Sequence, residues 1–216
     1  MEIKVLKDIL GVNDQVAAAN RQTLDGNNIF AVNLMASPGA GKTSLILATV
    51  KALKGKTEIG VIEGDLSSSI DAEAVSKEDV PVIQINTGGA CHLDANMVRN
   101  ALNELPLPDM KLLFIENVGN LVCPAGFALG EHRNVVISST PEGDDKPVKY
   151  PFMFTKADAV ILNKTDLMPY LKYDIQAFSR AIKTINERAE VFPVSCTTGE
   201  GLQEWVAWLL KQMSGR

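Results

Sequence analysis

The stretch Ala36–Thr43, which reads ASPGAGKT, follows the apolar run Phe30–Met35 and precedes a helical pattern from Ser44 to Leu53. A glycine-rich turn between a buried strand and a helix points backbone N–H groups and the positive end of the helix dipole at phosphate oxygens. We therefore predict a nucleotide-binding phosphate loop, in which the lysine reaches the β- and γ-phosphates and the threonine holds Mg²⁺.

One position of this loop departs from the usual G-x-x-x-x-G-K-[ST] pattern, because Ala36 stands where the pattern has glycine. The residue types that touch phosphate and metal are retained. The alternative, a coincidental surface loop, is disfavoured by the flanking strand and helix that the motif requires. The residues of the loop that we predict to bind nucleotide are Gly39, Ala40, Gly41, Lys42, Thr43 and Ser44.

Seven apolar, β-branched runs predict strands, and helical patterns lie between many of them. The predicted strands are Phe30–Met35, Glu58–Ile62, Val80–Ile85, Leu112–Ile115, Val135–Ser138, Ala159–Leu162 and Val191–Val194. The predicted helices are Lys42–Leu53, Asp94–Glu104, Tyr173–Glu187 and Gly201–Met213. This alternation favours an α/β fold with a doubly wound, mostly parallel seven-stranded sheet and helices on both faces. Residues 1–28 are predicted as a helical extension with a cap at Asn13 or Asp14, and residues 29–216 as one globular domain.

The composition excludes several classes of function. The length of 216 residues suits one α/β domain with a substantial core. The net charge of −5 argues against nucleic acid or an anionic membrane as a partner. No apolar stretch reaches the length that spans a bilayer, and the first residues lack a signal-peptide core, so a cytoplasmic protein is expected. Three cysteines form no disulfide framework, which suits a reducing compartment.

Acidic residues follow the second and fourth predicted strands, at the edge where doubly wound sheets bind their ligands. Asp65 and Glu116 are carboxylates of the kind that hold Mg²⁺ or orient an attacking water. With Thr43 they form the predicted magnesium set, and with Lys42 the predicted catalytic set. Capping of a helix start is the alternative role for both, and for Glu63 neither role is favoured.

A second motif, N-K-x-D, follows the sixth predicted strand as Asn163, Lys164, Thr165 and Asp166. In GTPases this motif reads guanine. The Asp166 carboxylate accepts from two N–H donors of the base, Asn163 meets the other edge, and the aliphatic stem of Lys164 covers the ring plane. Adenine lacks that donor pair, so GTP is predicted, and a phosphate-loop ATPase or small-molecule kinase is the disfavoured alternative.

The loop that follows the seventh predicted strand resembles S-A-K, the last guanine-side element of GTPases. Ser195 keeps the serine, whereas Cys196 and Thr197 replace alanine and lysine. Ser195 and Cys196 join the predicted nucleotide-binding set, because a backbone contact to the base survives both changes. The lysine stem that would pack on the base is missing, and Cys196 is interpreted as a substitute for a small residue.

Cysteine and histidine residues that a plain GTPase does not need occur at the same predicted sheet edge. Cys91 and His92 follow the third strand, and Cys123 follows the Glu116 cluster. Thiolate and imidazole suit Zn²⁺ or Ni²⁺, so these residues are candidate metal ligands. Three ligands do not close a tetrahedron, and a second copy across a two-fold axis would supply more, which favours a homodimer. The alternative, ordinary small or satisfied side chains, is not decided by spacing alone, whereas His132 is interpreted as lying on a solvated face.

The motifs together resemble one family, the HypB hydrogenase nickel-incorporation GTPases of the SIMIBI class. The segments that carry the resemblance are residues 37–43, 63–65, 89–94, 115–124, 142–147 and 163–166. Residues 91–92 and 116–124 separate this family from its relative, the urease accessory G proteins, which carry a Cys-Pro-His metal motif. The resemblance implies a GTPase domain over residues 29–216 and favours Cys91, His92 and Cys123 as metal ligands.

The resemblance further implies an enzyme that hydrolyses GTP to GDP and phosphate and helps to deliver nickel to the large-subunit precursor of [NiFe] hydrogenase. It implies GTP or GDP, Mg²⁺ and Ni²⁺ or Zn²⁺ as cofactors, a metal- and GTP-linked homodimer, and a small HypA-like nickel- and zinc-binding partner. Residues 116–123 then transmit the nucleotide state to the metal ligands. Two alternatives remain: a urease-type or other metallocentre-assembly GTPase, and a non-catalytic metal store or scaffold that binds nucleotide.

Overall fold

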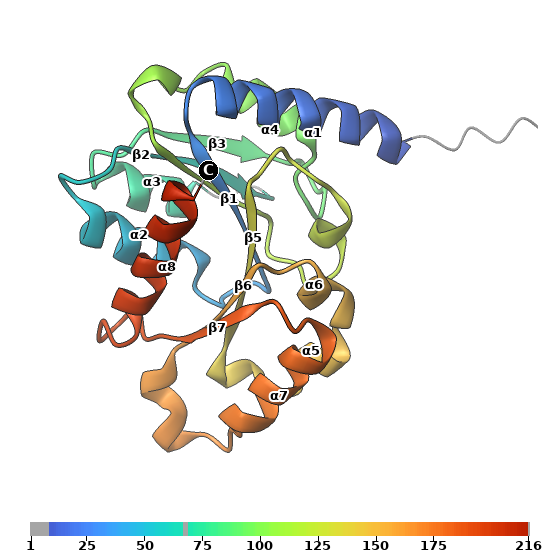
Figure 1. Ribbon diagram of the computed structural model, residues 1–216, viewed down its shortest axis with the longest axis vertical. Helices are drawn as coiled ribbons and strands as arrows, with labels where there is room; N and C mark the ends of the chain where they lie inside the picture. Colours follow the sequence, from blue (N-terminus) through green and yellow to red (C-terminus); the bar gives the residue numbers. More distant parts are fainter. Residues whose placement is uncertain (1–8, 67–68, 216) are drawn as a thin grey trace, which may run out of the picture.

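A single seven-stranded sheet forms the centre of the computed structural model, which describes residues 9–66 and 69–215 (Figure 1). Its strands lie in the order β3-β2-β4-β1-β5-β6-β7, and each pair of neighbours is parallel. The predicted doubly wound α/β fold is confirmed, with a sheet that is wholly parallel over the described residues. The strands are β1 (Phe30–Ala36), β2 (Ile59–Asp65), β3 (Val82–Asn86), β4 (Leu112–Glu116), β5 (Arg133–Ser139), β6 (Ala159–Asn163) and β7 (Glu190–Pro193).

Helices cover both faces of the sheet. One face packs against α2, α3 and α8, and the other against α1, α4, α6 and α7. Three short helices, α3, α5 and α6, had no prediction, because each is too brief to show a helical period. The helices are α1 (Ile9–Gly26), α2 (Lys42–Leu53), α3 (Ile70–Ser76), α4 (Ala95–Leu102), α5 (Lys146–Lys149), α6 (Pro151–Thr155), α7 (Ile175–Ile185) and α8 (Leu202–Ser214). Short 3₁₀ turns are η1 (Leu107–Asp109), η2 (Cys123–Gly126), η3 (Thr140–Glu142) and η4 (Thr165–Tyr170).

The central strand β1 is buried along its whole length, which explains its near-continuous apolar sequence. Asn33 is the exception, and both polar atoms of its buried side chain are hydrogen-bonded. Its Oδ1 accepts a hydrogen bond from Asn117 Nδ2 at 3.2 Å, and its Nδ2 donates to Asn134 Oδ1 at 2.9 Å. Buried amides are retained when they are hydrogen-bonded, and this row of amides ties β1 to the loop after β4 and to β5.

Helix α1 lies alongside α4 on one face of the domain (Figure 1). Two asparagines hold it there: Asn20 Nδ2 donates to the carbonyls of Ala95 and Leu129, and Asn13 Oδ1 accepts from the backbone N–H of Ala95. The predicted helix start at Asn13 or Asp14 is wrong, because the helix already includes Ile9. Residues 1–8 of the predicted extension lie outside the described residues, and the division at residue 28 stays a prediction.

The expectation of a solvated His132 is also wrong. Its side chain is only 8% exposed, and the ring stacks on Phe30 at 5.1 Å. Nδ1 accepts from the backbone N–H of Ala31 at 2.9 Å, and Nε2 lies 2.9 Å from Asp25 Oδ1 at the end of α1. Charged sequence neighbours suggested solvent, but the start of β5 buries the ring against β1.

Within the described residues, no helix is both long and apolar enough to cross a bilayer.

Candidate functional site

The phosphate loop joins β1 to α2 at the carboxyl edge of the sheet. Gly39 and Gly41 have φ angles of +76° and +101°, a region that only glycine adopts without strain. A Cβ on Gly41 would lie 2.3 Å from Asn163 Nδ2. Ala36 is instead the last residue of β1, where it is buried in the core and has no positive φ. The departure from the usual motif therefore falls where glycine is not required.

The predicted catalytic and magnesium residues at the start of α2 meet the end of β4. Thr43 Oγ1 donates to Glu116 Oε1 at 2.9 Å, and Lys42 Nζ lies 3.9 Å from the same oxygen. Glu116 is 2% exposed, so burial raises its pKa to about 7, although the Lys42 charge and the Thr43 hydrogen bond act in the opposite direction. Three residues from two distant segments thus form one compact polar cluster.

Two further carboxylates extend this cluster. Glu63 pairs with Glu116 in the parallel register of β2 and β4, and carboxylate oxygens of Glu63, Asp71 and Glu116 lie within 4.8 Å of one another. Burial, with the nearby Glu116 charge, raises the pKa of Glu63 to about 8. The Oε2 atoms of Glu63 and Glu116 are buried without a hydrogen-bond partner. Crowded oxygen ligands with unused lone pairs suit a hard divalent cation such as Mg²⁺.

Asp65, the predicted partner of Glu116, is the last residue of β2 and is half-buried. The sequence did not indicate Asp71 as part of the carboxylate cluster. Asp71 lies in α3, a helix too short to show a helical period in the sequence. Its only sequence signal was its position shortly after the second strand.

The predicted guanine-side residues are drawn together by Asn163. Its Nδ2 donates to the Ala40 carbonyl at 3.0 Å, and its Oδ1 accepts from the backbone N–H groups of Lys164 and Cys196 at 2.8 and 3.3 Å. Asn163 is 2% exposed, and its three hydrogen bonds connect three loops to one another. Its side chain holds the protein's own loops in place, a role that the motif alone did not indicate. Burial also raises the pKa of the Cys196 thiol to about 11, which fits its interpretation as a small apolar substitute.

Lys164 and Asp166 complete this side of the site. Lys164 adopts a left-handed conformation with φ of +63°, and its Nζ donates to the Gly39 carbonyl at 2.7 Å, so its stem runs back towards the phosphate loop. Ser195 Oγ donates to Asp166 Oδ1 at 2.6 Å and accepts from the Thr198 N–H at 3.1 Å. One oxygen of Asp166 is thereby fixed, which orients the carboxylate.

The three candidate metal ligands meet although they come from two separate loops, one with Cys91 and His92 and the other with Cys123. One ligand atom from each of Cys91, His92 and Cys123 lies within 4.8 Å of the others, and Cys91 Sγ is 3.5 Å from His92 Nδ1. The His92 ring stacks on Phe127 at 3.9 Å. Burial lowers the pKa of His92, which favours the neutral imidazole that binds metals. A hydrogen bond with Cys91 raises the pKa of the Cys123 thiol.

A link segment, defined here as residues 117–123, runs from the carboxylate cluster to the metal ligands. A Cβ on Gly119 would lie 2.9 Å from Pro38 N, so this part of the segment packs directly on the phosphate loop. The Asn120 N–H donates to the Ala36 carbonyl at 2.7 Å, and Asn120 Oδ1 accepts from Cys123 N at 3.3 Å. One asparagine therefore couples the backbone position of Cys123 to Ala36, where β1 passes into the phosphate loop.

Known proteins resemble this chain over nearly its whole length. The model of the CobW/HypB/UreG nucleotide-binding domain matches residues 30–193. Hydrogenase maturation factor HypB of Azotobacter vinelandii is 49% identical over 214 residues, which cover 99% of this chain and 71% of that protein. The chain belongs to the HypB family. Among solved structures, HypB of Archaeoglobus fulgidus has a TM-score of 0.89 at 38% identity, and it covers 94% of this chain and 100% of its own. HypB of Helicobacter pylori, solved in complex with nickel, has a TM-score of 0.90 at 36% identity. The match covers 94% of this chain and 95% of that protein.

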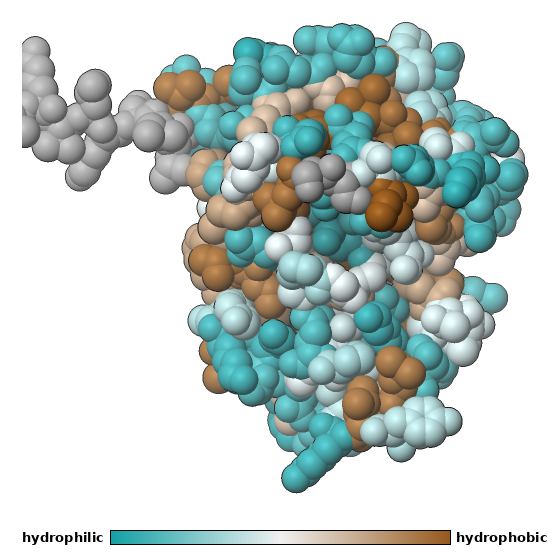
Figure 2. Space-filling model, turned by 180° about the vertical axis from the view of Figure 1, so that it is seen from behind, coloured by the Kyte–Doolittle hydropathy of each residue, from teal (hydrophilic) through white to brown (hydrophobic). Residues whose placement is uncertain are grey.

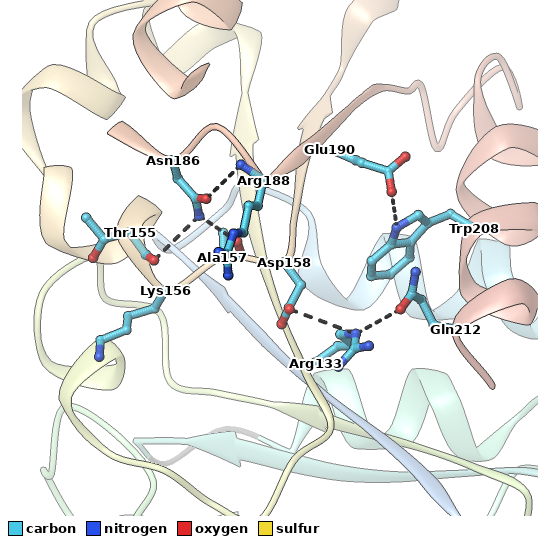
Figure 3. Close-up of a pocket in the computed structure, with 10 residues that line it drawn as sticks. All are labelled: Arg133, Thr155, Lys156, Ala157, Asp158, Asn186, Arg188, Glu190, Trp208 and Gln212. Atoms are coloured by element: carbon cyan, nitrogen blue, oxygen red, sulfur yellow. Dashed lines mark hydrogen bonds and ion pairs between the residues drawn. The ribbon is translucent and has the colours of Figure 1, made fainter. Parts of the chain in front are cut away.

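In this HypB chain, a cavity lies at the opposite edge of the sheet, at the start of β5, β6 and β7 (Figure 3). It has a volume of about 310 Å³. Arg133 Nε donates to Gln212 Oε1 and Trp208 Nε1 donates to Glu190 Oε1, both at 2.9 Å. These contacts fasten α8 to the strand starts, and the lining residues include none of the predicted site.

Proposed function

We propose that this HypB-family chain is a GTP-hydrolysing metallochaperone that assists nickel insertion into [NiFe] hydrogenase, with its metal affinity set by the bound nucleotide. The observation that carries this proposal is the link segment, which contacts the phosphate loop through Gly119 and Asn120 and ends at Cys123. In this proposal, a nucleotide that moves the phosphate loop acts on the link segment and, through it, on the position of Cys123. The two sites thereby gain a shared element on which coupling can act.

The nucleotide site we propose extends from Gly39–Ser44 to Asn163, Lys164, Asp166, Ser195 and Cys196. Asp166 selects GTP over ATP by accepting from the two guanine donors. Lys42, Asp65 and Glu116 are the proposed catalytic residues. A lysine of the phosphate loop and carboxylates at the ends of β2 and β4 are groups of the kind that phosphoryl transfer uses.

Thr43, Asp65 and Glu116 are the proposed magnesium ligands, and the unpartnered oxygens of Glu63 and Glu116 support a divalent cation close by. Bound there, Mg²⁺ supplies positive charge that stabilises the phosphate oxygens. The protein groups orient the threonine hydroxyl and exclude bulk water from the cluster, since Glu63 and Glu116 are both almost fully buried.

Nickel is the cargo, held by Cys91, His92 and Cys123, and Zn²⁺ is the competing ion for the same soft donors. We propose that a second copy of the chain completes the coordination. The side chain of Val122, beside Cys123, is 59% exposed, and those of Leu66 and Ile70, after β2, are 48% and 72% exposed. Figure 2 shows several separate apolar patches on one face of the molecule. A two-fold contact at the metal ligands would cover apolar surface and add ligands together.

The remaining parts of the proposal rest on family membership. They are a HypA-like nickel- and zinc-binding partner and the hydrogenase large-subunit precursor as client. A cytoplasmic location and the domain division at residue 28 are proposed from the sequence pattern alone. A urease-type client is the alternative, and it is distinguished by which apo-enzyme accumulates when the gene is deleted.

The proposal is tested by nickel titrations of the chain with no nucleotide, with GDP and with a non-hydrolysable GTP analogue, alongside a turnover assay. We expect GTP hydrolysis that Lys42→Ala abolishes, and a nickel affinity and dimer fraction that differ between the GDP and analogue states. Equal nickel affinity without nucleotide, with GDP and with the analogue would refute the coupling between the nucleotide and the metal site. Unchanged GTP turnover in Lys42→Ala would refute the assignment of the phosphate loop. Nucleotide binding without turnover in the wild-type chain would favour the alternative of a non-catalytic scaffold.

A further inference from the structure

Residues 139–144, which we call the η3 segment, touch the phosphate loop through Glu142. The Ser37 hydroxyl donates a hydrogen bond to Glu142 Oε1. Glu142 Oε2 accepts from the backbone N–H and the hydroxyl of Ser139, both at 2.8 Å. One carboxylate therefore fixes the second residue of the phosphate loop to the end of β5. The function proposed above gives Glu142 no role.

The η3 segment also holds the guanine side of the site. Thr140 Oγ1 donates to the Lys164 carbonyl at 2.6 Å, and Ser139 lies opposite Asn163 in the register of β5 and β6. Ser139 and Thr140 are 1% and 2% exposed, so both contacts lie in the protein interior. The segment thus stands between the phosphate loop and the guanine motif and is bonded to each.

The charge of Glu142 is balanced on its outer side. Lys146 Nζ lies 4.0 Å from Glu142 Oε1, and the two side chains are only 21% and 16% exposed. An unpaired carboxylate beside a phosphate site would repel the nucleotide, and the lysine offsets that repulsion. Hydrogen bonds to an ionised acceptor are stronger than neutral ones, so the contact with Ser37 is suited to hold a loop in one conformation.

We propose that Glu142 is a positioning residue for the nucleotide, which holds the phosphate loop through Ser37 at a fixed spacing from the guanine motif. This inference rests on the proposed binding of GTP at these two loops. A loop that is ordered before binding pays less conformational entropy when the phosphates arrive, so the contact raises the affinity for GTP and GDP alike. Glu142 acts through Ser37 and does not itself meet the nucleotide.

A double-mutant cycle tests the inference. GDP and GTP affinities are measured by calorimetry, with Mg²⁺ present, for Ser37→Ala, Glu142→Ala and the double variant. We expect each single change to weaken both affinities by roughly tenfold, the effect typical of losing one hydrogen bond to a charged group. The double variant should lose no more than either single variant, because both changes remove the same bond. Glu142→Gln, which can still pair with both serines, should recover most of the affinity, and the exposed Glu104→Ala should leave it unchanged.

A purely structural role for Glu142 would lower the melting temperature of the protein while the folded variants keep their nucleotide affinity, and that result would overturn the inference. Additive losses in the double variant would overturn it too. If Glu142→Ala fails to fold, Ser37→Ala and Glu142→Gln decide alone, and wild-type affinity in Ser37→Ala refutes the contact. A wild-type chain that binds neither nucleotide would overturn the proposed function, and this inference with it.

Discussion

Asn117 Oδ1 accepts a hydrogen bond from the backbone N–H of Leu93 at 3.0 Å, across 24 residues of sequence. The same oxygen accepts from the N–H of Val118 at 3.0 Å, and Asn117 is fully buried. Leu93 follows the Cys91-His92 pair, whereas Asn117 begins the link segment that ends at Cys123. A single amide therefore ties together the two loops that carry the candidate metal ligands.

We expect Asn117→Ala to weaken nickel binding without touching a ligand. The change leaves the buried N–H of Leu93 without an acceptor, which costs about 1–3 kcal/mol of unfolding free energy. It also frees the Cys91-His92 turn from the link segment. Urea unfolding and nickel titration measure the two effects, with Asn96→Ala on the exposed face of α4 as the control. Wild-type nickel affinity in a folded Asn117→Ala protein would show that nickel binding does not depend on the bond between the two loops.

The three cysteines provide an internal comparison for the metal site. Cys91→Ser and Cys123→Ser should each weaken nickel affinity by more than the roughly 10–100-fold that loss of an outer-shell partner costs. Cys196→Ser should leave it unchanged, because Cys196 lies in the loop beside Asn163. Competition with a chelator of known affinity measures all three. Equal effects from the three changes would refute a site specific to Cys91 and Cys123.

Two glycines test the contact between the phosphate loop and the guanine motif. Gly41→Ala should abolish nucleotide binding, because the added Cβ would lie 2.3 Å from Asn163 Nδ2 and the backbone there has φ of +101°. Gly55→Ala is the matched control, with φ of +74° and no atom within 4 Å of the added Cβ. It should cost only about 1 kcal/mol of stability through backbone strain. Equal nucleotide affinity in both variants would contradict the packing.

The guanine motif predicts a change of base preference. Asp166→Asn replaces an acceptor by an amide, so it should lower GTP affinity by roughly tenfold or more. Xanthine presents an acceptor where guanine presents its amino group, and XTP should therefore bind the variant better than GTP does. Competition between GTP, ATP and XTP measures this preference. A variant that still prefers GTP would show that Asp166 does not read the base.

The buried carboxylates predict how stability depends on pH in protein free of divalent cations. The pKa values of Glu63 and Glu116 are about 8 and about 7 in the folded protein, against an ordinary 4.5. The folded state binds more protons than the unfolded state between pH 4.5 and pH 8, so the free energy of unfolding falls as pH rises through that range.

Urea titrations at pH 5.5 and pH 8 measure this loss of stability. Glu63→Gln should reduce it, since a neutral amide neither titrates nor repels Glu116, and Glu104→Gln on the exposed surface should not. Added Mg²⁺ should recover stability at pH 8, because the cation satisfies the ionised oxygens. If the free energy of unfolding depends on pH equally in Glu63→Gln and Glu104→Gln, the raised pKa of Glu63 is refuted.

The sequence determined the seven strands of this protein, its longer helices and the chemistry at the strand ends. Seven strands, the phosphate loop and the guanine motif are encoded in short windows, because strand periodicity, glycine placement and motif spacing are local properties. The unusual Ala36 was visible there too. Only the structure showed that this residue lies inside β1, where the backbone does not need a glycine.

Only the tertiary structure decided which loops touch. The order β3-β2-β4-β1-β5-β6-β7 brings the loops after β1, β3, β4, β5 and β6 to one edge, so that Asn163 bonds to Ala40 and Asn117 to Leu93. Neither contact has a local signal, because a hydrogen bond between distant residues depends on strand order and register. The same reason hid Asp71 and the burial of His132. Residue type fixed the chemistry that this chain offers, and packing fixed which of those groups act together.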